Sequence, residues 1–170
     1  MKILRWMREL PDTLMALPLV SGFLPLVAVR SGVRPKVRVR IRGSTTVLIP
    51  DRPTAMVLAN IWVRKVYPPP EASDIVLDIG ANIGLFSLYA LKSGIRRVHS
   101  VEPCPESVTY LRAHLDGHPL GARATLYHAA IGTASGTAYI PVRNSAANRI
   151  QKTQAVETVP VDVLDATVFF

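Results

Sequence analysis

The sequence is short of several features that would each point to a particular class of protein. Cys104 is the single cysteine among 170 residues, so the chain can form no internal disulfide and no thiolate metal site is expected. Aromatic residues make up only 6% of the chain. The apolar stretch 14–29 is not expected to span a membrane, because it is shorter than the roughly 20 residues of a spanning helix and contains Pro18 and Pro25. With 170 residues, 49% of them hydrophobic, the chain is expected to form one domain with a real core, and its single cysteine favours the cytoplasm.

Acidic residues are scarce in the first part of the chain. Residues 1–65 hold 12 Lys and Arg against 3 Asp and Glu, whereas residues 66–170 hold 8 against 9. Within the first part, residues 36–42 alternate basic and apolar side chains with the period of a half-buried strand. The favoured interpretation is a solvated strand face, and the alternative is a surface that binds nucleic acid, an acidic lipid or an acidic substrate. For the apolar N-terminal segment, the favoured interpretation is a pair of short helices that cover a core, and peripheral membrane contact is the alternative. Nucleic acid is not an expected partner, because no aromatic side chains interleave with the arginines.

The basic part is predicted to be a leader of residues 1–70. A turn at residues 43–45 is predicted to join strand 36–42 to strand 46–50 in a β-hairpin. A helix over residues 55–66 should bury Leu58, Ile61, Trp62 and Val66, and the prolines at 68–70 end it. Residues 71–170 are then the core domain.

The core domain opens with a strand, a glycine turn and a helix in immediate succession. Residues 75–77 form a continuous apolar run, which predicts a central parallel strand buried on both faces. A helix over 85–93, a strand over 97–101, a helix starting at Pro105 and a strand over 124–128 follow. This series predicts an α/β fold, the N-terminal half of a doubly wound, Rossmann-like sheet, with a ligand at the carboxyl ends of the strands.

The chemistry of the turn favours a nucleoside without phosphate. Gly80 and Gly84 allow close backbone approach, and Glu102, at the end of the second strand, can accept both hydroxyls of a ribose. The spacing Asp-x-Gly-x-Asn-x-Gly lacks the third close glycine of a dinucleotide site, and Asp78 would repel phosphate but suit a cation. S-adenosylmethionine meets these demands, and a nicotinamide cofactor fits them less well.

The same residues resemble the FkbM-type methyltransferases, a family with the class I, S-adenosylmethionine-dependent fold. The likeness lies in residues 76–87, in Val101-Glu102-Pro103, and in Ala130-Ile131-Gly132 ahead of Ser135-Gly136, and it spans about residues 58–165. It implies O-methylation of a hydroxyl on a small molecule or glycan: a sugar, a glycolipid or another natural product. It also implies cofactor contacts for the following residues: Asp78, Gly80, Ala81, Asn82, Gly84 and Glu102.

Some parts of the family pattern are missing. Thr133 stands where the family commonly has an acidic residue, and the chain ends before the position of that family's Lys-x-Asp-x-Glu-Gly-like motif. The resemblance therefore implies an incomplete, C-terminally truncated domain whose first strand is an open edge, completed by another chain or by a homo-oligomer. The alternatives are that residues 156–163 cap this edge, or that the chain is a catalytically inactive fragment or partner subunit that keeps the cofactor pocket.

Neither a catalytic base nor a metal site is assigned from the sequence. His128 follows the third strand within reach of the pocket, but a lone histidine there is more often structural. His99, His114 and His118 are expected at the surface, without partners at metal-binding spacing.

Overall fold

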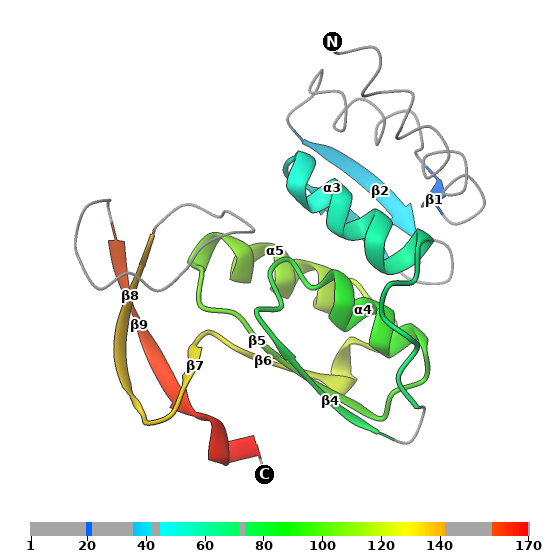
Figure 1. Ribbon diagram of the computed structural model, residues 1–170. Helices are drawn as coiled ribbons and strands as arrows, with labels where there is room; N and C mark the ends of the chain where they lie inside the picture. The colour runs from blue at the N-terminus through cyan, green and yellow to red at the C-terminus, as the bar shows by residue number, and fades with distance from the viewer. Residues whose placement is uncertain (1–19, 22–35, 42–44, 72–73, 142–157, 170) are drawn as a thin grey trace. The chain divides into compact units, whose positions relative to one another are not determined.

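The computed structural model describes residues 20–21, 36–41, 45–71, 74–141 and 158–169 (Figure 1). The chain divides into two compact units, one of residues 1–69 with 117–119 and one of residues 70–116 with 120–170. The apolar stretch 14–29, and with it the membrane-contact hypothesis, lies outside the described residues except for Val20–Ser21. No helix within the described part of the chain is long and apolar enough to cross a membrane.

The first unit contains the predicted hairpin. Strand β2 (Val37–Ile41) pairs antiparallel with β3 (Thr46–Ile49), and β1 (Val20–Ser21) pairs with the other edge of β2. Val39 and Val47 face each other across the hairpin and are fully buried, whereas Arg38 and Arg40 are exposed. The alternation of apolar and basic residues therefore predicts correctly which face of this strand is buried.

The helix predicted over residues 55–66 is shorter and less regular than expected. Helix α3 (Arg52–Leu58) begins where the Asp51 side chain accepts a 2.8 Å hydrogen bond from the Thr54 N–H, and it continues as a π-helix, η1 (Ala59–Val63). Leu58, Ile61 and Trp62 are buried as predicted. The prediction for Val66 is wrong: the helix ends before it, and its side chain is 56% exposed.

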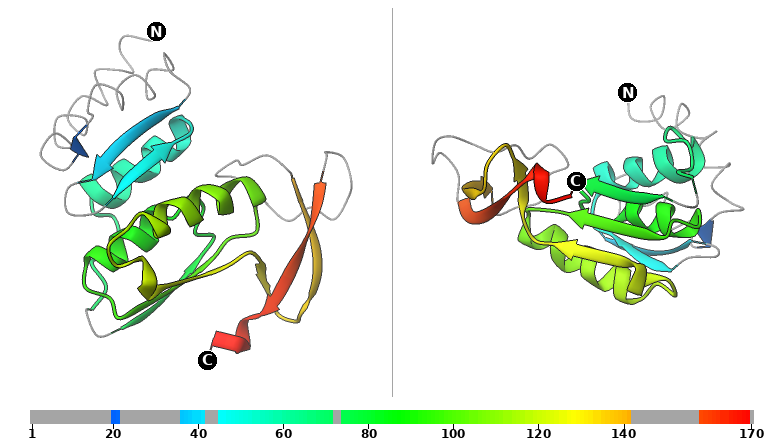
Figure 2. Two further views of the ribbon diagram at one scale, coloured as in Figure 1. Left: turned by 180° about the vertical axis from the view of Figure 1, so that it is seen from behind. Right: turned by 90° about the horizontal axis from the view of Figure 1, so that it is seen from below.

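The second unit is built on a parallel sheet. Its strands are β4 (Ile75–Ile79), β5 (Arg97–Val101) and β6 (Ala124–Tyr127), in that order. The crossover helices are α4 (Leu85–Lys92) and α5 (Pro105–Asp116), and a 3₁₀ turn, η2 (Gly121–Arg123), precedes β6. Both helices lie on the same face of the sheet, as the views from behind and from below show (Figure 2). The predicted β-α-β-α-β series is confirmed as a mixed α/β unit with a parallel sheet.

The prediction that the first strand is buried on both faces is wrong. Within the described residues β4 is an edge of the sheet, paired only with β5. Ile75 and Ile79 are 55% and 59% exposed, and only Asp78 among the residues of β4 is buried. An apolar run is typical of a strand buried on both faces, but a run by itself does not show which elements cover it.

A second, smaller sheet follows that the sequence analysis did not predict. It contains β7 (Ala130–Gly132), β8 (Gly136–Pro141) and β9 (Thr158–Asp165), with β9 in the centre, and a 3₁₀ turn, η3 (Ala166–Phe169), comes after it. The hypothesis that residues 156–163 cap the first strand is therefore wrong, because β9 pairs with β7 and β8. The sheet packs its own small core against the loop after β5, through Cys104, Ala130, Ile140 and Val161.

Candidate functional site

The loop between β4 and α4 adopts a backbone that favours glycine. Gly80 and Gly84 have φ angles of 74° and 86°, and Asn82 between them has a φ of 51°. The N–H groups of Gly80 and Ala81 both donate to the carbonyl of Val101, at 2.9 and 3.0 Å. These two bonds hold the loop against the carboxyl end of β5, directly before Glu102.

Glu102 is held in place by two backbone donors. One carboxylate oxygen accepts from the Asn82 N–H and the other from the Cys104 N–H, both at 2.8 Å. The Glu102 side chain is only 7% exposed. Glu102 therefore ties the glycine loop of β4 to the loop after β5, and its orientation is fixed by groups that can only donate.

Asp78 is also buried, but its hydrogen bonds come from the start of helix α4. The Ser87 hydroxyl donates to its carboxylate at 2.6 Å, and the Ser87 backbone N–H donates to the same carboxylate. Ser100 on β5 lies 2.8 Å from the Ser87 hydroxyl oxygen and completes a buried chain of polar groups. The Asp78 charge therefore meets the N-terminal end of α4, where the helix dipole favours an anion.

Burial changes the ionisation of both carboxyl groups. Desolvation raises the pKa of Asp78 above its ordinary value, and the two hydrogen bonds from Ser87 oppose this rise. Desolvation also raises the pKa of Glu102; the N–H groups of Cys104 and Asn82 oppose the rise, and the nearby Asp78 charge adds to it. A cation placed near this pair would stabilise both charges.

The two glycines of the loop differ in what surrounds them. A Cβ at Gly84 would lie 2.5 Å from Leu111 Cδ1, so Gly84 allows helix α5 to pack closely against the loop. A Cβ at Gly80 would have no atom within 4 Å, and Gly80 is exposed. There is therefore open space in front of Gly80, where a ligand could approach the backbone.

Three polar residues that support this site were missed from the sequence. Ser87 and Ser100 hold Asp78, and the buried His114 ring hydrogen-bonds through Nδ1 to the Ile83 carbonyl at 2.7 Å. Because a carbonyl only accepts, His114 Nδ1 carries the proton and donates it. Burial lowers the pKa of His114, which favours this neutral form. The sequence contains one signal for the burial of His114: it lies three residues after Leu111, on the same face of helix α5.

The predicted surface positions of the histidines are partly wrong. His114 and His118 are 4% and 7% exposed, because each lies on the packed side of its segment. His99 is half-buried, and its Nδ1 lies 3.0 Å from the Tyr127 hydroxyl. His128 is exposed and donates from Nε2 to the Pro103 carbonyl at 3.1 Å. No group of three or more His, Cys, Asp or Glu in the described ranges could hold a metal ion.

Comparison with known proteins gives limited similarity. No known family profile and no curated protein matches the chain. Among solved structures, the crystal structure of methyltransferase FkbM from Methylobacillus flagellatus KT is similar, with a TM-score of 0.44 and 15% sequence identity. The match covers 96% of this chain and 38% of that chain, so the present chain spans well under half of its length. That protein bears the name of the family that the sequence motifs resemble. The function proposed for the present chain rests on loop 78–84 and Glu102.

Proposed function

We propose that this chain binds S-adenosylmethionine and supplies the cofactor-binding part of a methyltransferase. The observation that carries the proposal is the Glu102 carboxylate, fixed by the N–H groups of Asn82 and Cys104 at the carboxyl end of a parallel strand. In open α/β sheets, ligands bind outside the carboxyl ends of the strands. An acidic group at this position can bind the hydroxyls of a ribose.

The hydrogen bonds of Glu102 leave acceptor sites for the hydroxyls of a ribose. An ionised carboxylate has about four acceptor sites on its two oxygens. Each oxygen of Glu102 accepts one of the two backbone hydrogen bonds described above, so each keeps capacity for a ligand hydroxyl. The open space in front of Gly80 belongs to the same site, because the N–H groups of Gly80 and Ala81 bind the Val101 carbonyl directly before Glu102.

The charges favour a cationic ligand over a phosphate. In dinucleotide sites the pyrophosphate lies at a helix N-terminus. Here the Asp78 carboxylate already meets the start of α4, and the N–H groups of Gly80 and Ala81 donate to Val101. A phosphate would be repelled by Asp78, whereas S-adenosylmethionine carries a sulfonium and an ammonium group and no phosphate. These features favour S-adenosylmethionine over a nicotinamide cofactor.

When bound, S-adenosylmethionine would supply a methyl group on a positively charged sulfur. We propose a hydroxyl of a sugar, glycolipid or other natural product as the acceptor, following the family resemblance. The residues of this chain would contribute by holding and orienting the cofactor: Glu102 at the ribose and Asp78 and Gly80 towards the methionine end. Orientation of two reactants is a large part of the catalysis of such a displacement. We assign no residue as the base for the acceptor hydroxyl.

Calorimetric titration of the chain with S-adenosylmethionine tests the proposal. We expect binding that is lost in Glu102→Ala and retained in the matched control Glu106→Ala, which removes an exposed glutamate from α5. NAD should bind much more weakly than S-adenosylmethionine. Absence of S-adenosylmethionine binding by a chain with folded circular dichroism would contradict the proposal, and equal loss in both variants would contradict the role of Glu102.

A binding-only chain is the second candidate function. It rests on the same site: Glu102 and Asp78 can hold the cofactor, and we assign no residue to the acceptor hydroxyl. Incubation with radiolabelled S-adenosylmethionine and a panel of hydroxylated acceptors distinguishes the two. Labelled product identifies an active enzyme, whereas binding without any transfer favours a cofactor-binding subunit.

A further inference from the structure

Strand β2 carries a row of basic side chains on one face of the hairpin. Lys36, Arg38 and Arg40 are exposed, and the apolar residues that alternate with them are buried. Successive side chains of a strand point to opposite faces, so the three cations share the outward face. We call these three residues the basic face.

The described part of the first unit offers little negative charge to the basic face. It contains six Lys and Arg and one acidic residue, Asp51, whose side chain caps helix α3. The residues opposite Arg38 and Arg40 on β3 are Leu48 and Thr46, which are uncharged. Alternate residues of a strand lie about 7 Å apart, within the Debye length of about 10 Å at 0.1 M salt, so neighbouring cations repel one another. A bound polyanion would relieve this repulsion.

Protection of a sheet edge does not explain the charge at Arg40. Basic side chains commonly protect an edge strand from unwanted pairing. At Arg40, however, β2 is paired on both sides, with Ser21 of β1 and with Thr46 of β3. The arrangement favours instead a face that meets an anionic partner.

We propose that the basic face docks on the anionic headgroups of a lipid membrane. Side chains on one face of a sheet can reach a flat surface together, so all three cations can contact it at once. Residues 30–42 contain six basic residues and no acidic one. Clusters of about four to eight Lys and Arg beside an apolar segment are typical of binding to anionic lipids.

The apolar stretch 14–29 favours a membrane over other polyanions. Strand β1 belongs to this stretch and pairs with β2, so part of the stretch lies in the same sheet as the basic face. Membrane anchoring commonly combines apolar contact with attraction between basic residues and anionic lipid. The phosphates of a nucleic acid would bind the cations alone.

Vesicle flotation tests the proposal. We expect the wild-type chain to float with vesicles of phosphatidylcholine and phosphatidylserine in equal parts, and not with phosphatidylcholine alone. Added salt should weaken the binding, because it screens the attraction. Arg38→Gln/Arg40→Gln should bind about 25-fold more weakly, since each basic side chain near the surface contributes about fivefold. Equal flotation with both kinds of vesicle, or with neither, would overturn the proposal.

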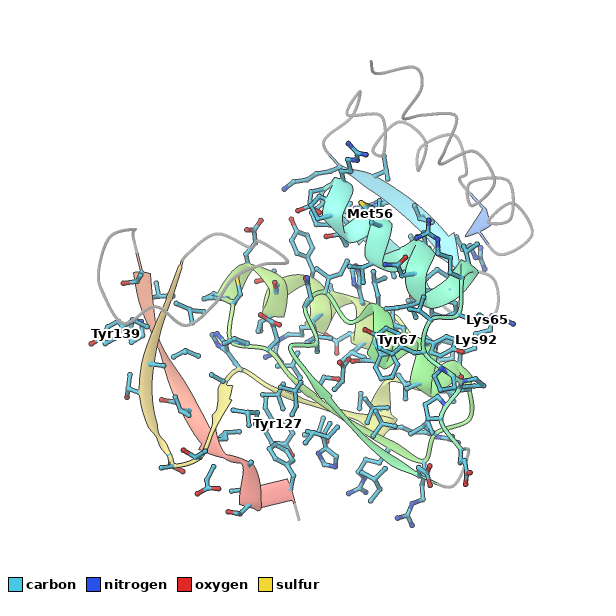
Figure 3. The ribbon with its side chains drawn as sticks, in the orientation of Figure 1. Met56, Lys65, Tyr67, Lys92, Tyr127 and Tyr139 are labelled. Carbon is cyan, nitrogen blue, oxygen red and sulfur yellow. The ribbon has the colours of Figure 1, made fainter. Side chains whose placement is uncertain are left out.

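Two further variants separate the basic face from net charge. Arg64→Gln/Lys65→Gln removes the same charge from exposed residues that follow η1, where Figure 3 shows Lys65, and should retain most of the binding. Arg38→Lys/Arg40→Lys keeps the charge and should bind like wild type. Retained urea midpoints show that the variants are folded. Equal loss in the two glutamine variants would overturn the assignment to β2.

Competition distinguishes a membrane from other anions. Neither RNA nor inorganic phosphate, at the phosphate concentration of the lipid, should displace the chain from anionic vesicles. Displacement by RNA would assign the face to nucleic acid, and displacement by phosphate would assign it to a small anion; either result would overturn the proposal. The proposed cofactor residues lie in the other unit, so Arg38→Gln/Arg40→Gln should keep its affinity for S-adenosylmethionine. Failure of the docking proposal is therefore distinguishable from failure of the proposed function.

Discussion

Asp78 and Glu102 are both buried carboxylates at the candidate site, yet they differ in the kind of donor that holds them. The Ser87 hydroxyl at Asp78 can rotate and exchange its roles of donor and acceptor, and Ser100 lies next to it. The partners of Glu102 are two backbone N–H groups, which cannot accept. Amide substitutions at the two positions should therefore have opposite consequences for stability.

Asp78→Asn should leave the free energy of unfolding at pH 7 unchanged or raise it. The new amide can donate to Ser87 Oγ while its oxygen accepts the Ser87 N–H, and the cost of a buried charge disappears. Glu102→Gln should lower the free energy of unfolding by about 1–3 kcal/mol, because its amide nitrogen would face a backbone donor. Urea denaturation of the two variants measures this. Equal destabilisation by both would contradict the argument.

The raised pKa values of these groups predict a pH dependence of defined sign. A carboxyl whose pKa is higher in the folded than in the unfolded state stabilises the fold below its unfolded pKa, and this stability is lost as the pH rises through the folded pKa. Between about pH 4 and the raised pKa of Asp78, wild type should therefore lose stability relative to Asp78→Asn. Thermal melts of both chains at several pH values measure the difference. A difference that grows toward acid would contradict the assigned direction.

The affinity for S-adenosylmethionine should increase over the same pH window in which the wild-type fold loses stability. Only the ionised forms of Asp78 and Glu102 attract a cation, so affinity should increase as the pH rises through their raised pKa values. The affinity of Asp78→Asn should depend less on pH than that of wild type. Calorimetric titrations at a series of pH values from about pH 4 upward, where ordinary carboxyl groups ionise, measure this. An affinity independent of pH would contradict a role for the two charges.

At the scale of elements, the glycine loop combines two functions that substitution can separate. Gly84→Ala would place a methyl group against Leu111 at a φ of 86°, and overpacking with a left-handed alanine should cost about 2–4 kcal/mol of stability. Gly80→Ala has the backbone cost alone, about 1–2 kcal/mol, because the space around it is open. Its methyl group would instead obstruct the ligand. Urea denaturation should therefore show the larger loss of stability for Gly84→Ala. Calorimetric titration should show that Gly80→Ala loses more affinity for S-adenosylmethionine in proportion to its loss of stability.

The local elements could be predicted because their signals lie close together in the sequence. Alternation predicts β2, and the direct succession of apolar run, glycine turn and helix predicts β4 and α4. The exposure of Ile75 could not be predicted from the apolar run, because it depends on which strand lies beside β4; it agrees instead with the open edge that the family resemblance implies. The same holds for β9, whose pairing with β7 and β8 joins residues separated by a long stretch of chain.

The candidate site could be predicted in part for the same reason. Asn82 and Glu102 stand at the ends of adjacent elements, so the rule for parallel sheets brings them together. The Asp78–Ser87–Ser100 chain and the His114 contact depend on which face of each element is buried. Serine and histidine carry no strong signal of burial. They can be identified only once the helix packing is known.

At the scale of the whole molecule, each of the two units has buried apolar residues and optical probes of its own. Val39 and Val47 are fully buried in the first unit, and Leu88 and Leu111 in the second. Both tryptophans, Trp6 and Trp62, belong to the first unit, whereas four of the five tyrosines belong to the second. Tryptophan fluorescence therefore reports on the unit with the hairpin, and tyrosine circular dichroism mainly on the unit with the glycine loop.

These probes predict how a ligand should change unfolding. A ligand that binds only the folded state stabilises it by about 2.7 kcal/mol at a concentration one hundred times its Kd. The proposed S-adenosylmethionine site lies entirely in the second unit, through Asp78, Gly80 and Glu102. Saturating S-adenosylmethionine should therefore raise the urea midpoint seen by tyrosine circular dichroism and leave the tryptophan midpoint unchanged. If both midpoints rise together, the two units unfold as one cooperative body; if only the tryptophan midpoint rises, the ligand binds the first unit and the proposed site is wrong.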